Sequence, residues 1–229
     1  MSYIIDPAPQ VTLPVVGESA KFPVNNIYCV GRNYADHAIE MGGDPNREAP
    51  FFFMKPAFAV SSNGVEMAYP AHSNDVHHEV ELVVALASGG VNISVEKAME
   101  LVFGYGVGVD MTRRDQQGEA KEKRRPWEAG KTFYQAAPCS DLISIAATGE
   151  LNSGDIALSI NGEVRQQGDV SQMIWKVAEV ISRLSELFYL QAGDLIFTGT
   201  PAGVGPVAKG DQIVASVAGL PALSFKVSE

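Results

Sequence analysis

Three carboxylates are the residues of this chain whose types and spacing best suit chemistry. Glu79 and Glu81 are two residues apart, and Asp110 ends a run in which glycines alternate with larger residues. Side chains two apart along a β-strand point to the same face, so Glu79 and Glu81 would stand side by side in a strand. Carboxylates that close repel each other unless one is protonated or a cation lies between them. A cation site and three solvated strand-end carboxylates both fit this spacing.

The residues that follow favour a hard cation. Residues 82–86 form an uninterrupted apolar run, and buried charges are generally paired or bound to a metal. A set of oxygen ligands without sulfur or nitrogen indicates Mg²⁺ or Mn²⁺ before Zn²⁺. His78-Glu79 does not complete a zinc protease motif, because Leu82 stands where that motif needs a second histidine. We expect His77 and His78 to support the site or the fold rather than to bind the metal.

A histidine and a lysine elsewhere could act beside such a cation. His37 and Glu40 are three residues apart in a candidate helix and therefore share a face. Such a pair can activate a water as a general base, although many similar pairs only decorate a helix end. Lys131 follows Trp127 in a sequence that suggests partial burial, and a buried lysine needs a carboxylate or an anionic substrate as a partner. The run 121–125 is interpreted as mostly a solvated charge cluster.

The composition limits the classes of partner. The 229 residues are 46% hydrophobic and 19% charged, with a formal net charge of −10. The acidic balance argues against nucleic acid binding through the overall field, and an anionic substrate would need a locally positive site. The sequence shows neither a signal-peptide layout at its start nor the ~20 consecutive apolar residues of a membrane span, so we expect a cytoplasmic protein. We expect Cys29 and Cys139 to be reduced and non-catalytic.

Many short strands and few helices are expected to position these residues. Residues 1–24 predict a lead-in segment with one hairpin, followed by a single domain over 25–229. Asn161-Gly162 predicts a type I′ hairpin between 156–160 and 163–166, and residues 199–206 predict a tight loop whose backbone approaches a ligand or a strand. The pattern favours a β-rich α+β domain over a doubly wound sheet. Further strands are predicted near 27–31, 51–54, 104–110, 195–200, 212–217 and 223–227, and helices near 32–41, 94–103 and 171–190.

Several motifs in a fixed order resemble the fumarylacetoacetate hydrolase family, in its short acylpyruvate and fumarylpyruvate hydrolase branch. The resemblance extends from residue 25 to 229. The segments that carry it are 31–37 (GRNYADH), 53–56 (FMKP), 77–82 (HHEVEL), 110–115 (DMTRRD), Lys131 and 198–206 (TGTPAGVGP). It implies a mainly β fold, the β-roll of the family's C-terminal domain, with mixed sheets, a few short helices and a homodimeric assembly.

The resemblance also implies roles for individual residues. One Mg²⁺ or Mn²⁺ per chain would be held by Glu79, Glu81 and Asp110, with Lys131 beside it as a catalytic group. His37 and Glu40 would activate the water. Larger relatives add a fourth carboxylate to the metal, but this chain has Val30 and Gly31 near that point, so a water is expected there. The substrate would be bound by Arg32, Arg114, Gln117 and Thr200.

The implied reaction is hydrolysis of the C3–C4 bond of a small anionic 2-oxo acid, an acylpyruvate. Fumarylpyruvate, an intermediate of gentisate breakdown in aromatic catabolism, is the favoured substrate. A second hypothesis keeps the metal site but makes the protein an oxaloacetate decarboxylase or a 2-oxo acid tautomerase. A third is a β-rich binding or assembly module with merely exposed acidic residues.

Overall fold

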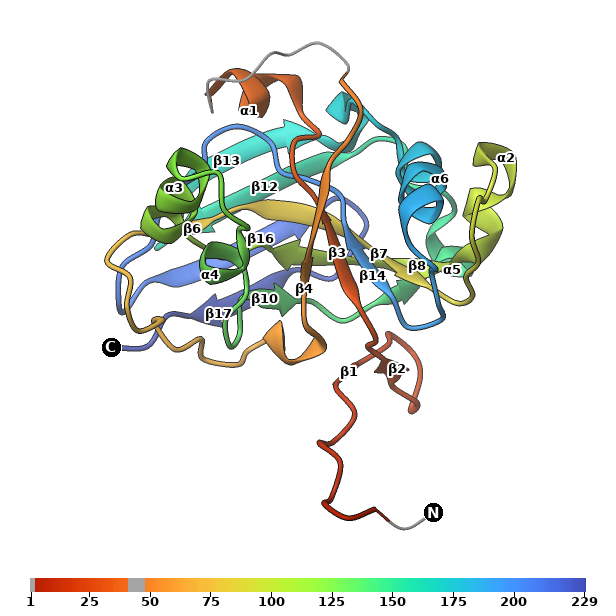
Figure 1. Ribbon diagram of the computed structural model, residues 1–229, viewed down its shortest axis with the longest axis horizontal. Helices are drawn as coiled ribbons and strands as arrows, with labels where there is room; N and C mark the ends of the chain where they lie inside the picture. The colour runs from red at the N-terminus through yellow and green to blue at the C-terminus, as the bar shows by residue number, and fades with distance from the viewer. Residues whose placement is uncertain (1–2, 41–47) are drawn as a thin grey trace.

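A mixed sheet runs through the middle of the molecule (Figure 1). The structure is a computed structural model that describes residues 3–40 and 48–229, and the side chains of Ala38 and Glu40 lie outside the described part. β14 pairs in parallel with β3, and β10 with β5, while the remaining pairs of this sheet are antiparallel. Its strands in spatial order are β4 (Phe52–Lys55), β3 (Ile27–Val30), β14 (Leu195–Phe197), β7 (Val80–Leu86), β8 (Val102–Val109), β10 (Ala137–Cys139) and β5 (Val60–Ser62), with β11 (Ile143–Ser144) also paired to β8.

A second, antiparallel sheet packs on the first. Its strands β12 and β16 contact β7 and β8, and the apolar core lies between the two sheets. Asn161 and Gly162 both have positive φ, 53° and 85°, as the predicted hairpin requires. The order of this sheet is β13 (Glu163–Asp169), β12 (Asp155–Ile160), β16 (Gln212–Val217) and β17 (Leu223–Lys226).

Two small sheets complete the β-structure. One consists of β15 (Gly205–Pro206), β6 (Val76–His78) and β9 (Thr112–Arg113). The other is the predicted N-terminal hairpin of β1 (Thr12–Leu13) and β2 (Phe22–Pro23), which lies beyond the main body in Figure 1.

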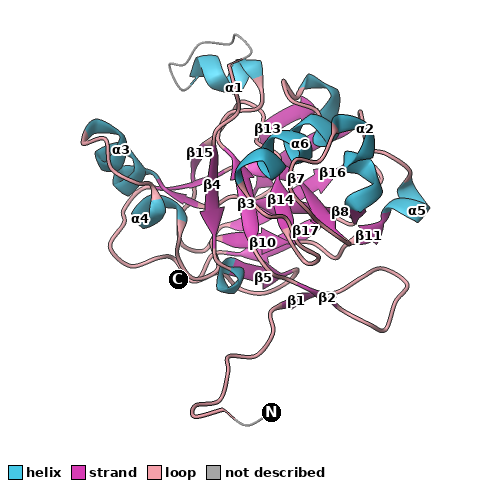
Figure 2. Cartoon of the chain, turned by 45° about the vertical axis from the view of Figure 1, so that its right-hand side comes forward, coloured by secondary structure: helices cyan, strands magenta, loops and turns pink. Residues whose placement is uncertain are grey.

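The helices are short and lie at the periphery of the sheets (Figure 2). The α-helices are α1 (Ala35–Glu40), α2 (Val95–Ala98), α3 (Arg114–Glu122), α4 (Glu128–Lys131), α5 (Ile145–Thr148) and α6 (Val177–Leu187), and the 3₁₀ turns are η1 (Ala57–Ala59), η2 (Met99–Leu101) and η3 (Val170–Gln172). The mainly β fold with few short helices is therefore confirmed. Across residues 3–40 and 48–229, no helix is long and apolar enough to cross a lipid bilayer.

Two predicted helices were too long. The helix predicted over 171–190 is η3 followed by α6, because Asn33 holds the intervening backbone out of helical geometry. The Ile174 N–H donates to the Asn33 carbonyl oxygen and the Trp175 N–H to Asn33 Oδ1, each at 2.7 Å. The helix predicted over 94–103 ends within η2, and its last residues belong to β8. The helix predicted over 32–41 begins at Ala35, and its last predicted residue, Met41, lies outside the described residues.

The alternating glycines of β8 allow the close packing that their spacing predicts. A Cβ atom on Gly104 would lie 2.1 Å from the carbonyl oxygen of Ile143, and one on Gly108 would lie 2.6 Å from the Phe197 ring. No side chain fits at these distances, so neighbouring segments approach the backbone of β8 directly. β8 is thereby held firmly next to β7, which carries part of the candidate site.

Candidate active site

The three carboxylates meet where the chain passes from one sheet to another. Glu79 lies between two strands rather than within one, because β6 ends at His78 and β7 starts in the large sheet at Val80. The Asp110 N–H donates to the carbonyl oxygen of Glu79 at 2.8 Å, and Glu81 lies opposite Gly108 in the β7–β8 ladder. All three carboxylates are buried, and one oxygen of each lies within 4.8 Å of the others.

Two buried lysines contact this triad. Lys131 Nζ lies 2.8 Å from Glu79 Oε2 and 2.7 Å from Asp110 Oδ2, and it donates to Thr112 Oγ1 at 2.7 Å. Lys55 Nζ lies 2.8 Å from Asp110 Oδ1. Burial opposes the charge of Lys131, but the carboxylates of Asp110 and Glu79 outweigh it and raise the pKa of this ammonium. The buried position that the sequence suggested for Lys131 is therefore observed.

The charges of Glu79 and Glu81 differ in how they are compensated. Burial alone would raise the pKa of Glu79, but Lys131 and Arg114 hold this pKa well below its usual value. The pKa of Glu81 is raised well above its usual value, first by burial and then by Asp110 and Glu79. Glu81 Oε2 accepts the Gly199 N–H at 2.6 Å, but within the described residues no ion pair joins Glu81 to a cationic side chain. A divalent cation bound among these oxygens would give Glu81 the ionic partner that Glu79 and Asp110 already have, so the residues fit Mg²⁺ or Mn²⁺.

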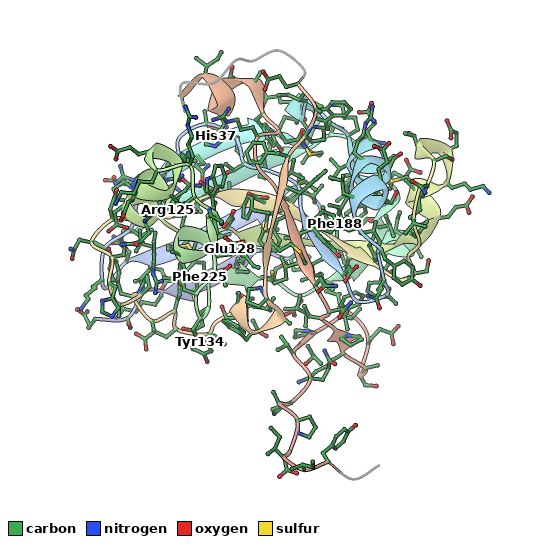
Figure 3. The ribbon with its side chains drawn as sticks, viewed as in Figure 1. His37, Arg125, Glu128, Tyr134, Phe188 and Phe225 are labelled. Carbon is green, nitrogen blue, oxygen red and sulfur yellow. The ribbon has the colours of Figure 1, made fainter. Side chains whose placement is uncertain are left out.

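His37 lies on α1 and faces the same cleft. Figure 3 shows it beneath α1, on the side of the molecule that carries Arg125 and Glu128. Its ring is buried, and its charge contributes to lowering the pKa of Glu79. Glu40 is the last residue of α1, but its side chain lies outside the described part, so the pairing of His37 with Glu40 remains a prediction.

The predicted substrate residues line the cleft together. Arg114 Nη2 contacts Glu79 Oε1, and its Nη1 donates to Gln117 Oε1 at 2.7 Å. Thr200 follows Gly199 in the loop after β14, where Gly199 has a φ of +99°. The cleft is bordered by Val30, Gly31, Arg32, His37, Phe53, Glu79, Glu81, Arg114, Gln117, Lys121, Trp127, Lys131, Gly199 and Thr200.

Three further residues contribute that the sequence analysis did not single out. Lys55 pairs with Asp110, and the FMKP motif that contains it was the only signal. Gln166 is buried on β13; its Nε2 donates to Thr200 Oγ1 at 2.8 Å, and its Oε1 accepts the Val80 N–H at 3.0 Å. Lys121 lines the cleft and is partly buried, whereas residues 122–125 are exposed, so it is the exception in a run that is mostly solvated as predicted.

Comparison with known proteins agrees with this fold and site. The C-terminal domain model of the fumarylacetoacetate hydrolase family matches residues 26–228. A fumarylpyruvate hydrolase of Ralstonia sp is 41% identical over 184 residues, which cover 80% of this chain and 95% of that protein. A mitochondrial oxaloacetate tautomerase of Mus musculus is 42% identical over 202 residues, which cover 88% of this chain and 91% of that protein. The crystal structure of a fumarylpyruvate hydrolase from Pseudomonas aeruginosa in complex with Mn²⁺ and pyruvate superposes with a TM-score of 0.97, at 47% identity over 99% of each chain.

A mainly β enzyme with a site for a divalent cation is thus defined by the fold, the buried carboxylates and these matches. The chain belongs to the fumarylacetoacetate hydrolase family.

Proposed function

We propose that this protein hydrolyses fumarylpyruvate to fumarate and pyruvate in a reaction that depends on a divalent cation. The observation that carries the proposal is that Glu79, Glu81, His37, Lys131 and Arg114 line one cleft, and that Asp110 completes the triad with an oxygen within 4.8 Å of theirs. Support comes from the 47% identical relative whose crystal structure holds Mn²⁺ and pyruvate, one of the two expected products. Because fumarylpyruvate is an intermediate of gentisate breakdown, this activity assigns the protein to aromatic catabolism. The proposal also includes a homodimeric assembly, which the family resemblance implies, and a cytoplasmic location.

In this proposal Glu79, Glu81 and Asp110 hold the cation. When bound, the cation supplies Lewis-acid stabilisation of the negative charge that develops on the 2-oxo acid. Lys131 donates from Nζ to Glu79 and Asp110 and thereby fixes the direction of their oxygens. Glu79, Asp110 and Thr112 take all three N–H groups of this ammonium, so its positive charge acts on the substrate next to the triad through the electric field rather than through a hydrogen bond.

His37 is the general base of the proposed reaction. Its imidazole takes a proton from a water, and the hydroxide equivalent attacks C4 of the substrate. The C3–C4 bond then breaks with its electron pair on C3, and protonation of C3 gives pyruvate, while C4 becomes the new carboxylate of fumarate. One water is consumed for each bond broken. Glu40 would orient the imidazole, and Arg32, Arg114, Gln117 and Thr200 would bind the substrate.

The test is an assay of the purified protein with Mn²⁺ and fumarylpyruvate, in which released pyruvate is reduced by lactate dehydrogenase. We expect His37→Ala to lower kcat by roughly 10²–10⁴-fold, the usual contribution of a general base. The same variant should still gain thermal stability from Mn²⁺, because His37 is not one of the proposed ligands. Pyruvate release that does not exceed the rate of a Glu79→Ala control would refute the proposal.

Oxaloacetate tautomerase is a second candidate, because relatives of that name are 40–42% identical to this chain. Tautomerisation uses the same stabilisation of negative charge at C3 but no hydrolytic water. His37→Ala should then retain much of the wild-type rate, followed by the ultraviolet absorbance of enol-oxaloacetate. A wild-type protein that equilibrates oxaloacetate but leaves fumarylpyruvate intact would favour this second function.

A further inference from the structure

Helix α3 presents a row of polar side chains to the cleft. Arg114, Gln117 and Lys121 are spaced three and four residues apart, so they lie on one face of the helix, and all three border the cleft. Arg114 contacts Glu79 at the end where the cation would bind. Lys121 follows two turns later, about 10 Å along the axis at 1.5 Å per residue. The row therefore leads from the metal end of the cleft to a second cationic position.

Lys121 differs from the other basic residues of its segment. Lys123 Nζ donates to Glu119 Oε1, and both side chains are about half exposed. Lys121 is partly buried instead, and its Nζ lies 5.0 Å from the centre of the Trp127 ring. In the described portions of the chain, no carboxylate forms an ion pair with Lys121.

The surroundings of Lys121 make its charge costly. Burial, followed by the nearby charges of Arg114 and Arg32, lowers the pKa of Lys121 to about 8. The carboxylate of Glu79 opposes this lowering of the pKa but does not outweigh it. An ammonium beside two guanidinium groups and without a paired carboxylate is stabilised by an anion that enters from the cleft.

The charge balance of the whole site also favours an anionic ligand near Lys121. Five cationic side chains, Lys55, Lys131, Arg114, Arg32 and Lys121, surround the three carboxylates of the triad. A bound divalent cation adds two further positive charges. A monoanionic substrate leaves much of this excess uncompensated, whereas a dianion with carboxylates at both ends places negative charge at each end of the cleft.

We propose that Lys121 binds the far carboxylate of the substrate and thereby selects dicarboxylic 2,4-dioxo acids over monocarboxylic ones. This inference rests on the proposed function and names the substrate feature that the cleft recognises. In fumarylpyruvate six bonds separate the two carboxylate carbons, about 7 Å in an extended chain at about 1.2 Å per bond. This length is of the same order as the rise of about 10 Å between the backbone positions of Arg114 and Lys121 on α3. In oxaloacetate only three bonds separate the two carboxylate carbons, so its carboxylates are about half as far apart as those of fumarylpyruvate.

The test compares Lys121→Met with the wild type on two substrates. Methionine keeps an unbranched apolar stem against Trp127 but removes the ammonium, and fumarylpyruvate and acetylpyruvate differ in whether they carry a far carboxylate. We expect kcat/KM for fumarylpyruvate to fall about 10- to 100-fold, mainly through KM, as loss of a charged hydrogen bond predicts. The value for acetylpyruvate should change less than about twofold. Lys123→Met, on the outer side of α3, is the matched control and should change neither substrate.

A binding measurement separates this inference from the proposed reaction. In titration calorimetry with the Mn²⁺-loaded protein, Lys121→Met should weaken fumarate binding about 10-fold or more and leave pyruvate binding unchanged. Failure of the wild type to hydrolyse either substrate would overturn the proposed function. The calorimetry would still test whether Lys121 binds the far carboxylate, because it measures binding without a reaction. Equal losses for both substrates, or unchanged fumarate binding in Lys121→Met, would overturn the role of Lys121.

Discussion

Replacing Glu81 by glutamine should have opposite effects on the metal-free and the metal-loaded protein. Glutamine has nearly the same shape and keeps an oxygen that can accept the Gly199 N–H, but it removes one of three buried carboxylates. At the 4.8 Å limit between ligand oxygens, two charges repel by about 3.5 kcal/mol at an effective dielectric constant of about 20. Proton uptake by Glu81 and the charge of Lys131 relieve part of this repulsion. We therefore expect metal-free Glu81→Gln to be more stable than the wild type by about 1–3 kcal/mol.

The pH dependence of this gain follows from the raised pKa of Glu81. A carboxyl group whose pKa is higher in the folded than in the unfolded state binds its proton more tightly when folded. Its cost to stability therefore appears as the pH rises above the ordinary glutamate value of about 4.3, and it is absent below that value. The advantage of Glu81→Gln should thus be absent near pH 4 and should grow as the pH rises from there toward the raised pKa of Glu81.

Thermal unfolding in EDTA and in excess Mn²⁺ measures both effects. A chain of this size changes Tm by about 2–4 °C per kcal/mol, so the metal-free variant should melt about 2–12 °C higher than the wild type. Mn²⁺ at about 1,000 times its Kd adds about 4.1 kcal/mol to the wild type, and much less to a variant that lacks one ligand, so the order of the two Tm values should reverse. Glu163→Gln, at an exposed ion pair with Arg165, is the control and should show neither effect. A metal-free variant less stable than the wild type at pH 7, or a full Mn²⁺ shift in Glu81→Gln, would refute the reasoning.

Three other predictions address the cleft and its support. Because the pKa of Lys121 is lowered to about 8, its ammonium is lost as the pH rises through that value, and KM for fumarylpyruvate should increase above about pH 8 while KM for acetylpyruvate does not. Gln166→Leu removes the donor to Thr200 and should cost about 2–4 kcal/mol in urea unfolding and raise KM; an unchanged KM would contradict the proposed role of Thr200 in binding the substrate. Gly199→Ala places a Cβ 2.7 Å from the Cβ of Asn33, at a φ of +99°. We therefore expect a loss of about 2–3 kcal/mol in the free energy of unfolding and a smaller increase of Tm on adding Mn²⁺. A variant as stable as the wild type would contradict this expectation, because it would show that the loop adapts to the added methyl group.

The sequence predicted those strands and turns whose geometry depends on residues that are neighbours in the sequence. The Asn161-Gly162 hairpin follows from two residues that tolerate positive φ, and the strand predicted at 212–217 has the bounds of β16. The helix predicted over 171–190 failed at its start because Asn33, far away in the sequence, binds the backbone there. Such a tertiary hydrogen bond leaves no periodic trace in the segment that it reshapes.

For the candidate site, too, the sequence predicted what depends on nearby residues and missed what depends on the folded chain. The acidic triad could be inferred from the alternation of a strand, although the chain actually changes sheets at Glu79. Lys121 was assigned to a solvated cluster because a run of basic residues in sequence does not show which one turns inward. That distinction depends on the face of α3 and on the position of Trp127, and both are properties of the folded chain.

The origin of the triad in a single stretch of chain has a consequence for how new activities can arise. Residues 79–110 supply all three carboxylates through β7, β8 and the positions flanking them, whereas His37 and Thr200 come from distant segments. Ion binding and water activation are therefore encoded in separate parts of the sequence. Exchanging the α1 segment could remove or redirect the base without rebuilding the ion site, so one scaffold could gain or lose hydrolysis while it keeps its capacity to stabilise negative charge on a 2-oxo acid.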